Sequence, residues 1–171
     1  MKKIIFLDID GVLATSECLV HGMWGLVEDK QLLLKSILDK TGADIVLSSS
    51  WRKHKLEETK EYMTEKGFMF SDKIIGVTIR AYHYIEKESK VHLSIPRGVE
   101  IKQWIDTNIH SNNGKNWDRK KLGEDYQYVI IDDDGDMLLN QKDNFVRTDS
   151  ENGLTLLDSI QCIDILNKRC V

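Results

Sequence analysis

The chain has 171 residues, of which 41% are hydrophobic and 30% are charged. This length and composition predict a single domain over residues 1–171 with a substantial buried core. The formal net charge of −4 gives no support for broad attraction to nucleic acid or to membranes, and no membrane partner is expected.

The first predicted element is a buried strand that ends in two acids. Ile4, Ile5, Phe6 and Leu7 are followed by Asp8, Ile9, Asp10 and Gly11. The apolar run predicts a strand buried on both faces, and the glycine allows a sharp turn after it. Two carboxylates at the mouth of such a strand repel each other and lose hydration, which is costly unless a cation, a proton or a reaction uses them. The run is far too short for a signal peptide or a membrane span.

Strand and helix patterns alternate along the rest of the chain. Residues 80–96 show no clean period, and the segment 70–96 is expected to supply short loops, a small lid or an insertion. The remaining predicted elements are a loop at 14–25, a helix near 27–40 closed by Gly42, a strand at 43–47, a helix around 54–66 closed by Gly67, a strand at 73–79, a helix near 98–109, a surface loop at 110–125, a strand at 126–131, a short strand at 144–148 and a helix near 155–168 that starts with a capping box of Thr155 and Asp158.

This alternation predicts an α/β fold with a central, mainly parallel sheet and helices on both faces. In such sheets ligands bind beyond the carboxyl ends of the strands. Three predicted strands end there in polar side chains, namely Asp8 and Asp10, Ser48, and Asp132 and Asp133. We therefore expect these side chains to converge at one edge of the sheet.

A group of aspartates with no His or Cys partner in the pattern is a hard oxygen site, which suits Mg²⁺. With the metal present, one carboxylate could attack phosphorus to form an aspartyl-phosphate. A second acid could protonate the leaving oxygen and later activate water. A hydroxyl and a cation would be needed to hold the phosphoryl oxygens in the transition state.

Three segments carry a family resemblance. "FLDIDGVL" resembles the first motif of the haloacid dehalogenase (HAD) superfamily, "IVLSSSW" its second and "YVIIDDDGD" its fourth, in the family's order and across most of the chain. The resemblance implies a three-layer, Rossmann-like HAD fold, here without a large cap domain. An acid at position 10 is found in members that act on phosphoesters and not in the carbon–halogen-cleaving branch, which favours a phosphatase.

The resemblance also implies a role for each matching position. Asp8 would be the nucleophile, and Asp10 the general acid/base with its carbonyl on the metal. The remaining implied residues are Ser48 as a hydrogen-bond donor to the phosphoryl group, Ser49 in substrate binding, and Asp8, Asp10, Asp132 and Asp133 around Mg²⁺.

The cation of the third motif has two candidates in "RGVEIKQWI", Arg97 and Lys102. Arg97 is preferred because this stretch before "YVIIDD" resembles a small HAD branch related to the phosphatase domains of RNA-repair enzymes of the polynucleotide kinase-phosphatase kind. Lys102 stays the alternative. Trp24, in the loop after the first strand, is expected to border the substrate entrance.

The leading hypothesis is a Mg²⁺-dependent phosphatase acting on a phosphomonoester, carried by a small molecule or by a nucleic-acid end. A nearly capless, open site suits bulky phosphorylated ends. The alternative is a non-catalytic phosphate-binding or sensing module of the same fold. The basic clusters "WRKHK" and "DRKK" are interpreted as solvated faces, given the acidic total. Cys18, Cys162 and Cys170 form no CxxC pair, which favours reduced thiols and a cytoplasmic location.

Overall fold

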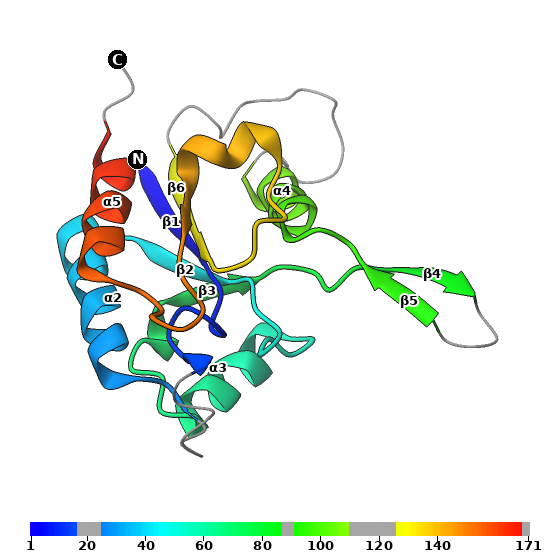
Figure 1. Ribbon diagram of the computed structural model, residues 1–171, viewed down its shortest axis with the longest axis horizontal. Helices are drawn as coiled ribbons and strands as arrows, with labels where there is room; N and C mark the ends of the chain where they lie inside the picture. The colour runs from blue at the N-terminus through cyan, green and yellow to red at the C-terminus, as the bar shows by residue number, and fades with distance from the viewer. Residues whose placement is uncertain (17–24, 87–90, 110–125, 169–171) are drawn as a thin grey trace.

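The structure is a computed structural model, and it describes residues 1–16, 25–86, 91–109 and 126–168. The predicted alternation of strands and helices is confirmed (Figure 1). The elements in chain order are β1 (Lys2–Leu7), α2 (Glu28–Thr41), β2 (Asp44–Leu47), α3 (Leu56–Glu65), the 3₁₀ helix η1 (Ser71–Lys73), β3 (Ile74–Val77), β4 (Tyr82–Glu86), β5 (Val91–Ser94), α4 (Arg97–Asn108), β6 (Tyr126–Asp132), the 3₁₀ helix η3 (Leu139–Asn144), β7 (Phe145–Arg147) and α5 (Leu156–Asn167).

The central sheet has five strands in the order β3-β2-β1-β6-β7, and every neighbouring pair is parallel. β1 lies in the middle, paired with β2 on one side and with β6 on the other. A strand in that position is covered on both faces, which explains its apolar run at residues 4–7. The carboxyl ends of β1, β2 and β6 therefore lie next to one another.

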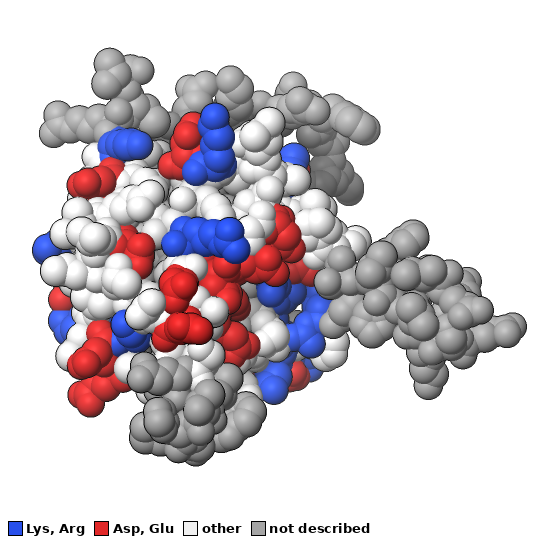
Figure 2. Space-filling model, in the orientation of Figure 1, with Lys and Arg blue, Asp and Glu red and all other residues white. Residues whose placement is uncertain are grey.

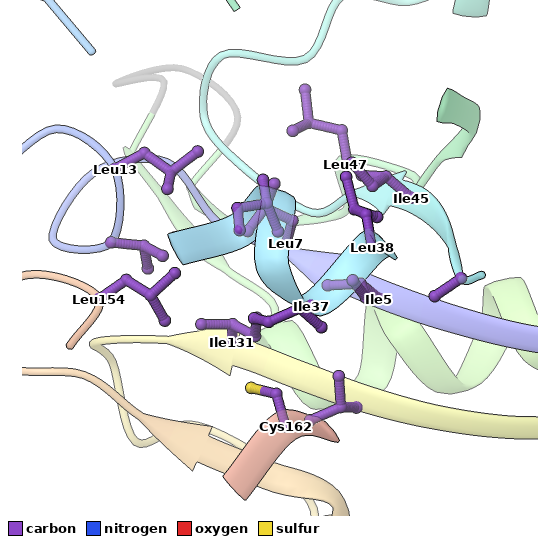
Figure 3. Packing of buried hydrophobic residues seen from close by; sticks show 14 of the residues in the cluster. Ile5, Leu7, Leu13, Ile37, Leu38, Ile45, Leu47, Ile131, Leu154 and Cys162 are labelled. Carbon is purple, nitrogen blue, oxygen red and sulfur yellow. The ribbon is translucent and has the colours of Figure 1, made fainter. Parts of the chain in front are cut away.

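Alternate residues of β1 serve two separate cores. Ile5 and Leu7 pack with Ile37 of α2 and Cys162 of α5 on one face of the sheet (Figure 3). Ile4 and Phe6 face the other side, where the Phe6 ring meets Trp104 of α4 edge-on at 5.5 Å between centroids. Each fully buried side chain of this size contributes roughly 1.5–3 kcal/mol. The two cores give the predicted three layers, helix, sheet and helix.

Local signals in the sequence appear as expected at the helix ends. Gly42 adopts a left-handed conformation with φ of 66° and ends α2. Thr155 and Asp158 form the capping box of α5: each side chain accepts a hydrogen bond from the other residue's backbone N–H. Cys162 is a buried free thiol.

The segment without a clean period contains a two-stranded antiparallel ribbon, β4–β5, that is separate from the central sheet. The ribbon extends away from the three layers (Figure 1). Because it does not pack in the core sheet, its sequence carries no core-facing period. The predicted loop at 110–125 lies outside the described residues. Among the helices that the structure describes, none is long and apolar enough to cross a membrane.

Candidate active site

Backbone hydrogen bonds hold the three predicted strand ends together. The N–H of Asp8 donates to the Ile131 carbonyl at 3.0 Å, and the N–H of Ser48 donates to the Leu7 carbonyl at 2.8 Å. The first bond extends the pairing of β1 with β6 to Asp8, one residue past β1. The second extends the pairing of β1 with β2 to Ser48, one residue past β2. The first polar residue after each strand is thus fixed at the same edge, as the sequence predicted.

Three acids form a cluster at this edge. One carboxylate oxygen from each of Asp8, Asp132 and Asp133 lies within 4.8 Å of the other two. Asp8 and Asp132 are buried, and the buried Oδ1 of Asp8 has no hydrogen-bond partner among the described residues. Three carboxylates with an unsatisfied buried oxygen fit a hard divalent cation such as Mg²⁺.

Burial governs the electrostatics of this acid cluster. It raises the pKa of Asp8 above the ordinary carboxyl value, an effect opposed by a hydrogen bond from Ser49 and by the charge of Arg97. Burial raises the pKa of Asp132 as well, and the neighbouring charge of Asp8 adds to that increase. Asp133 is shifted upward in pKa by burial. A bound cation would reverse this balance, because it favours the charged carboxylates.

Gly11 is required by the packing of Asp133. Its φ of 69° lies in the left-handed region. A Cβ at this position would lie 2.3 Å from the Cγ of Asp133, far inside van der Waals contact. The glycine of the "DIDG" motif therefore makes room for an acid that arrives from β6.

Asp10 lies apart from the acid cluster and faces the loop between β2 and α3. Its Oδ2 accepts a hydrogen bond from the Ser50 hydroxyl, and its Oδ1 accepts one from Nε1 of Trp51, both at 2.9 Å. Asp10 is also exposed, whereas Asp8 is buried. The two acids of the motif thus have different surroundings, which suits different chemical roles.

The two predicted serines differ in their contacts. The Ser48 hydroxyl is buried and accepts a hydrogen bond from Thr78 Oγ1 at 3.3 Å. Ser49 is the serine that lowers the pKa of Asp8, and its oxygen accepts the N–H of Trp51. Ser49 therefore acts on the acid cluster electrostatically, while the Ser48 hydroxyl is bonded to Thr78, the residue after β3.

Arg97 and Lys102 lie in different places on α4. Arg97 is the first residue of the helix, and its Nε lies 3.8 Å from Oδ2 of Asp132. Its side chain is mostly buried and lines the cavity above the acid cluster. Lys102 is exposed and pairs with Asp106 on the solvent side of the helix. The structure brings Arg97, and not Lys102, to the site.

A buried ion pair beside Arg97 was missed by the sequence analysis. Arg52 donates to Oε2 of Glu100 at 2.7 Å, and Arg97 donates to the same oxygen at 3.0 Å. The interpretation of "WRKHK" as a solvated face is correct for residues 53–55 but wrong for Arg52, which is buried; Trp51 packs against the core and also bonds to Asp10. The available signal was Glu100, an acid flanked by apolar residues in "GVEIK".

The cavity over this edge has a volume of about 680 Å³. Acidic side chains gather in the middle of the face shown in Figure 2. The lining includes Asp8, Asp132, Asp133, Arg97, Arg80 and Arg147. The second predicted basic cluster and Trp24 lie outside the described residues.

Comparison with known proteins identifies the family. The family described as the HAD domain in Swiss Army Knife RNA repair proteins matches residues 4–158, and the chain belongs to this family. Neither a curated protein nor a solved structure matches the chain. The match confirms the predicted resemblance and the HAD fold, and it supports a HAD-type phosphatase acting on a phosphorylated substrate.

Proposed function

We propose that this chain is a Mg²⁺-dependent phosphomonoesterase that works through an aspartyl-phosphate on Asp8. The observation that carries the proposal is the acid cluster with its unsatisfied Asp8 oxygen, beside the guanidinium of Arg97. A buried carboxylate without a partner is expensive to maintain, and a nucleophile that meets metal and phosphate has a use for it.

Asp8, Asp132 and Asp133 would hold the metal, together with the backbone carbonyl of Asp10. When bound, Mg²⁺ would neutralise the repulsion among these carboxylates and polarise the phosphoryl group. Arg97 would pair with the phosphoryl oxygens. Its guanidinium is held in position by a hydrogen bond to Glu100. Ser48 and Ser49 would supply hydroxyl groups at the same end of the sheet.

The reaction takes two displacements at phosphorus. In the first, an Asp8 oxygen bonds to phosphorus, the ester P–O bond breaks, and protonated Asp10 gives its proton to the leaving oxygen. In the second, a water oxygen attacks phosphorus, Asp10 takes the water proton, and the bond between phosphorus and Asp8 breaks. Inorganic phosphate leaves, and both aspartates return to their starting states.

A nucleic-acid end is the proposed substrate class. Support comes from the description of the family, which places its members in RNA repair proteins. A cavity of about 680 Å³ that no large cap covers among the described residues also suits a terminal phosphate on a bulky chain.

The test measures phosphate release by wild type and Asp8→Asn, with Mg²⁺ and with a chelator. The panel holds nucleotides, sugar phosphates, a phosphopeptide and oligonucleotides phosphorylated at the 3′ or the 5′ end. Asp39→Asn, an exposed acid of α2 that pairs with Lys35, is the matched control. We expect Mg²⁺-dependent release, best with an oligonucleotide, that is lost only in Asp8→Asn.

Thermal unfolding must show that Asp8→Asn is folded. Full activity in that variant would contradict the mechanism. If wild type binds Mg²⁺ and phosphate by calorimetry but releases no phosphate from any substrate, the chain is a binding module and the proposed activity is wrong.

A further inference from the structure

A second cavity adjoins the active site and has the opposite charge. It has a volume of about 610 Å³ and lies between the β2–α3 loop and the end of β3. Ser50, Arg52 and Arg80 line both cavities, so the two are adjacent. We name the second cavity the basic groove; its lining also includes Lys53, His54, Glu58 and residues 77–79.

Positive charge dominates the basic groove. Arg52, Lys53 and Arg80 are its cations. Glu58 is the one acid among the described residues that line it, and its charge is already paired with Lys55 at 3.4 Å. Basic side chains lie beside the central acids in Figure 2. The acid cluster therefore suits a metal ion, and the neighbouring basic groove suits an anion.

Arg52 is fixed before any ligand arrives. Its guanidinium donates to the carbonyls of Ser49 at 2.5 Å and Ile79 at 2.8 Å, as well as to Glu100. These bonds join the two loops that form the groove. The buried Nε of Arg52 has no hydrogen-bond partner among the described residues. A buried guanidinium with an unsatisfied N–H favours a nearby anion.

The other two cations are also held in position. Arg80 donates to the Ser50 carbonyl at 2.5 Å, which places its side chain at the boundary of the two cavities. Nζ of Lys53 lies 3.6 Å from the centroid of the Tyr62 ring. Such contacts lower the entropic cost of ordering long side chains around a ligand.

We propose that the basic groove binds a second phosphate group of the substrate while the acid cluster acts on the first. The inference rests on the proposed function and narrows its substrate to molecules with at least two phosphates. The second group is either the phosphodiester next to the end of a nucleic acid or the other phosphate of a nucleoside bisphosphate. A local cationic groove also explains how a chain of net charge −4 would hold a polyanion.

The kinetic test compares a nucleoside monophosphate, the matching 3′,5′-bisphosphate and an oligonucleotide with the same phosphorylated end. For wild type we expect KM to be roughly tenfold lower when a second phosphate is present. Arg80→Ala and Lys53→Ala should each remove most of that advantage. Lys40→Ala is the control, because Lys40 is an exposed cation at the end of α2, at the opposite edge of the sheet.

The source of the second phosphate is decided by the same data. A low KM for both the bisphosphate and the oligonucleotide means that one additional phosphate suffices. A low KM for the oligonucleotide alone assigns the groove to a polymer. Equal KM values for all three substrates overturn the inference while phosphate release from the monophosphate leaves the proposed function standing.

Direct binding separates the inference from catalysis. Asp8→Asn and the double variant Asp8→Asn/Arg80→Ala are titrated with a fluorescently labelled, phosphorylated oligonucleotide, and anisotropy is followed at several salt concentrations. We expect the second variant to bind roughly tenfold more weakly, with a salt dependence reduced by about one unit of slope. Equal affinity and slope would overturn the inference even if no substrate is turned over.

Discussion

The packing of Gly11 against Asp133 gives a sharp test of the metal site, the substitution Gly11→Ala. Two costs follow from the structure. The first is conformational: at a φ of 69° an alanine is disfavoured by about 1–2 kcal/mol. The second is steric: a Cβ would lie 2.3 Å from Cγ of Asp133, where ordinary contact begins at 3.4 Å. Asp133 must retreat by about 1.1 Å, the difference between these two distances.

The chain contains a matched control for the conformational cost. Gly42 has nearly the same φ, 66°, but nothing lies within 4 Å of the position of its Cβ. Gly42→Ala therefore has the conformational cost without the steric cost. Gly42→Ala should lower the unfolding temperature by about 2–8 °C, the shift expected for 1–2 kcal/mol in a chain of this length, and Gly11→Ala should lower it by at least as much.

Only Gly11→Ala should damage the site. A carboxylate displaced by about 1 Å should weaken Mg²⁺ binding at least about tenfold and lower kcat/KM by up to about 100-fold. Calorimetric Mg²⁺ titration and phosphate release measure the two effects. If Gly11→Ala binds Mg²⁺ and turns over like Gly42→Ala, Asp133 is not a metal ligand and the reasoning fails.

Three other contacts give further predictions. Trp51→Phe keeps an aromatic ring but removes the hydrogen bond from the indole N–H to Asp10. Steady-state kinetics should therefore show kcat about tenfold lower, with KM little changed. An unchanged kcat would mean that this bond does not position the acid. Glu100→Ala removes the carboxylate that pairs with the buried Arg52, and chemical unfolding should show a loss of about 3–5 kcal/mol in the free energy of unfolding. Asp106→Ala, which removes an exposed acid, should lose less than about 0.5 kcal/mol. Equal losses would contradict the buried pair. Burial raises the pKa of Asp132, so above about pH 4 this carboxyl holds its proton more strongly in the folded chain than in the unfolded chain, and in chelator its contribution to the unfolding free energy should fall as the pH rises toward neutral. Asp132→Asn should flatten that fall, and a free energy that rises over the same pH range would refute the assignment.

The sheet and its acidic edge were predictable because their signals are local. The apolar runs at residues 4–7 of β1 and 129–131 of β6 lead directly into acids, and parallel strands must bring those ends to one edge. Thr155 likewise forms its capping box within one turn of helix. Each feature depends on residues close together in sequence, so the pattern alone specifies it.

The partners around the acids were not predictable, since they depend on contacts between distant segments. Arg52 is buried because Glu100, 48 positions away, supplies a carboxylate. Nothing in "WRKHK" separates that arginine from the exposed lysine that follows it. The influence of Ser49 on the pKa of Asp8 has the same origin, because side-chain direction at a strand end depends on the neighbouring strand.

These distant contacts share one segment, the loop of residues 49–52 after β2. Its Ser49 lowers the pKa of Asp8, and it bonds to Asp10 through a hydroxyl and an indole N–H and to Glu100 through a guanidinium. Glu100 in turn holds Arg97. The proposed nucleophile, acid and cation therefore share one short support, and a preorganised arrangement of this kind lowers the reorganisation needed in the transition state. The same loop forms one wall of the basic groove. A phosphate bound in the groove would therefore contact the segment that orients all three groups.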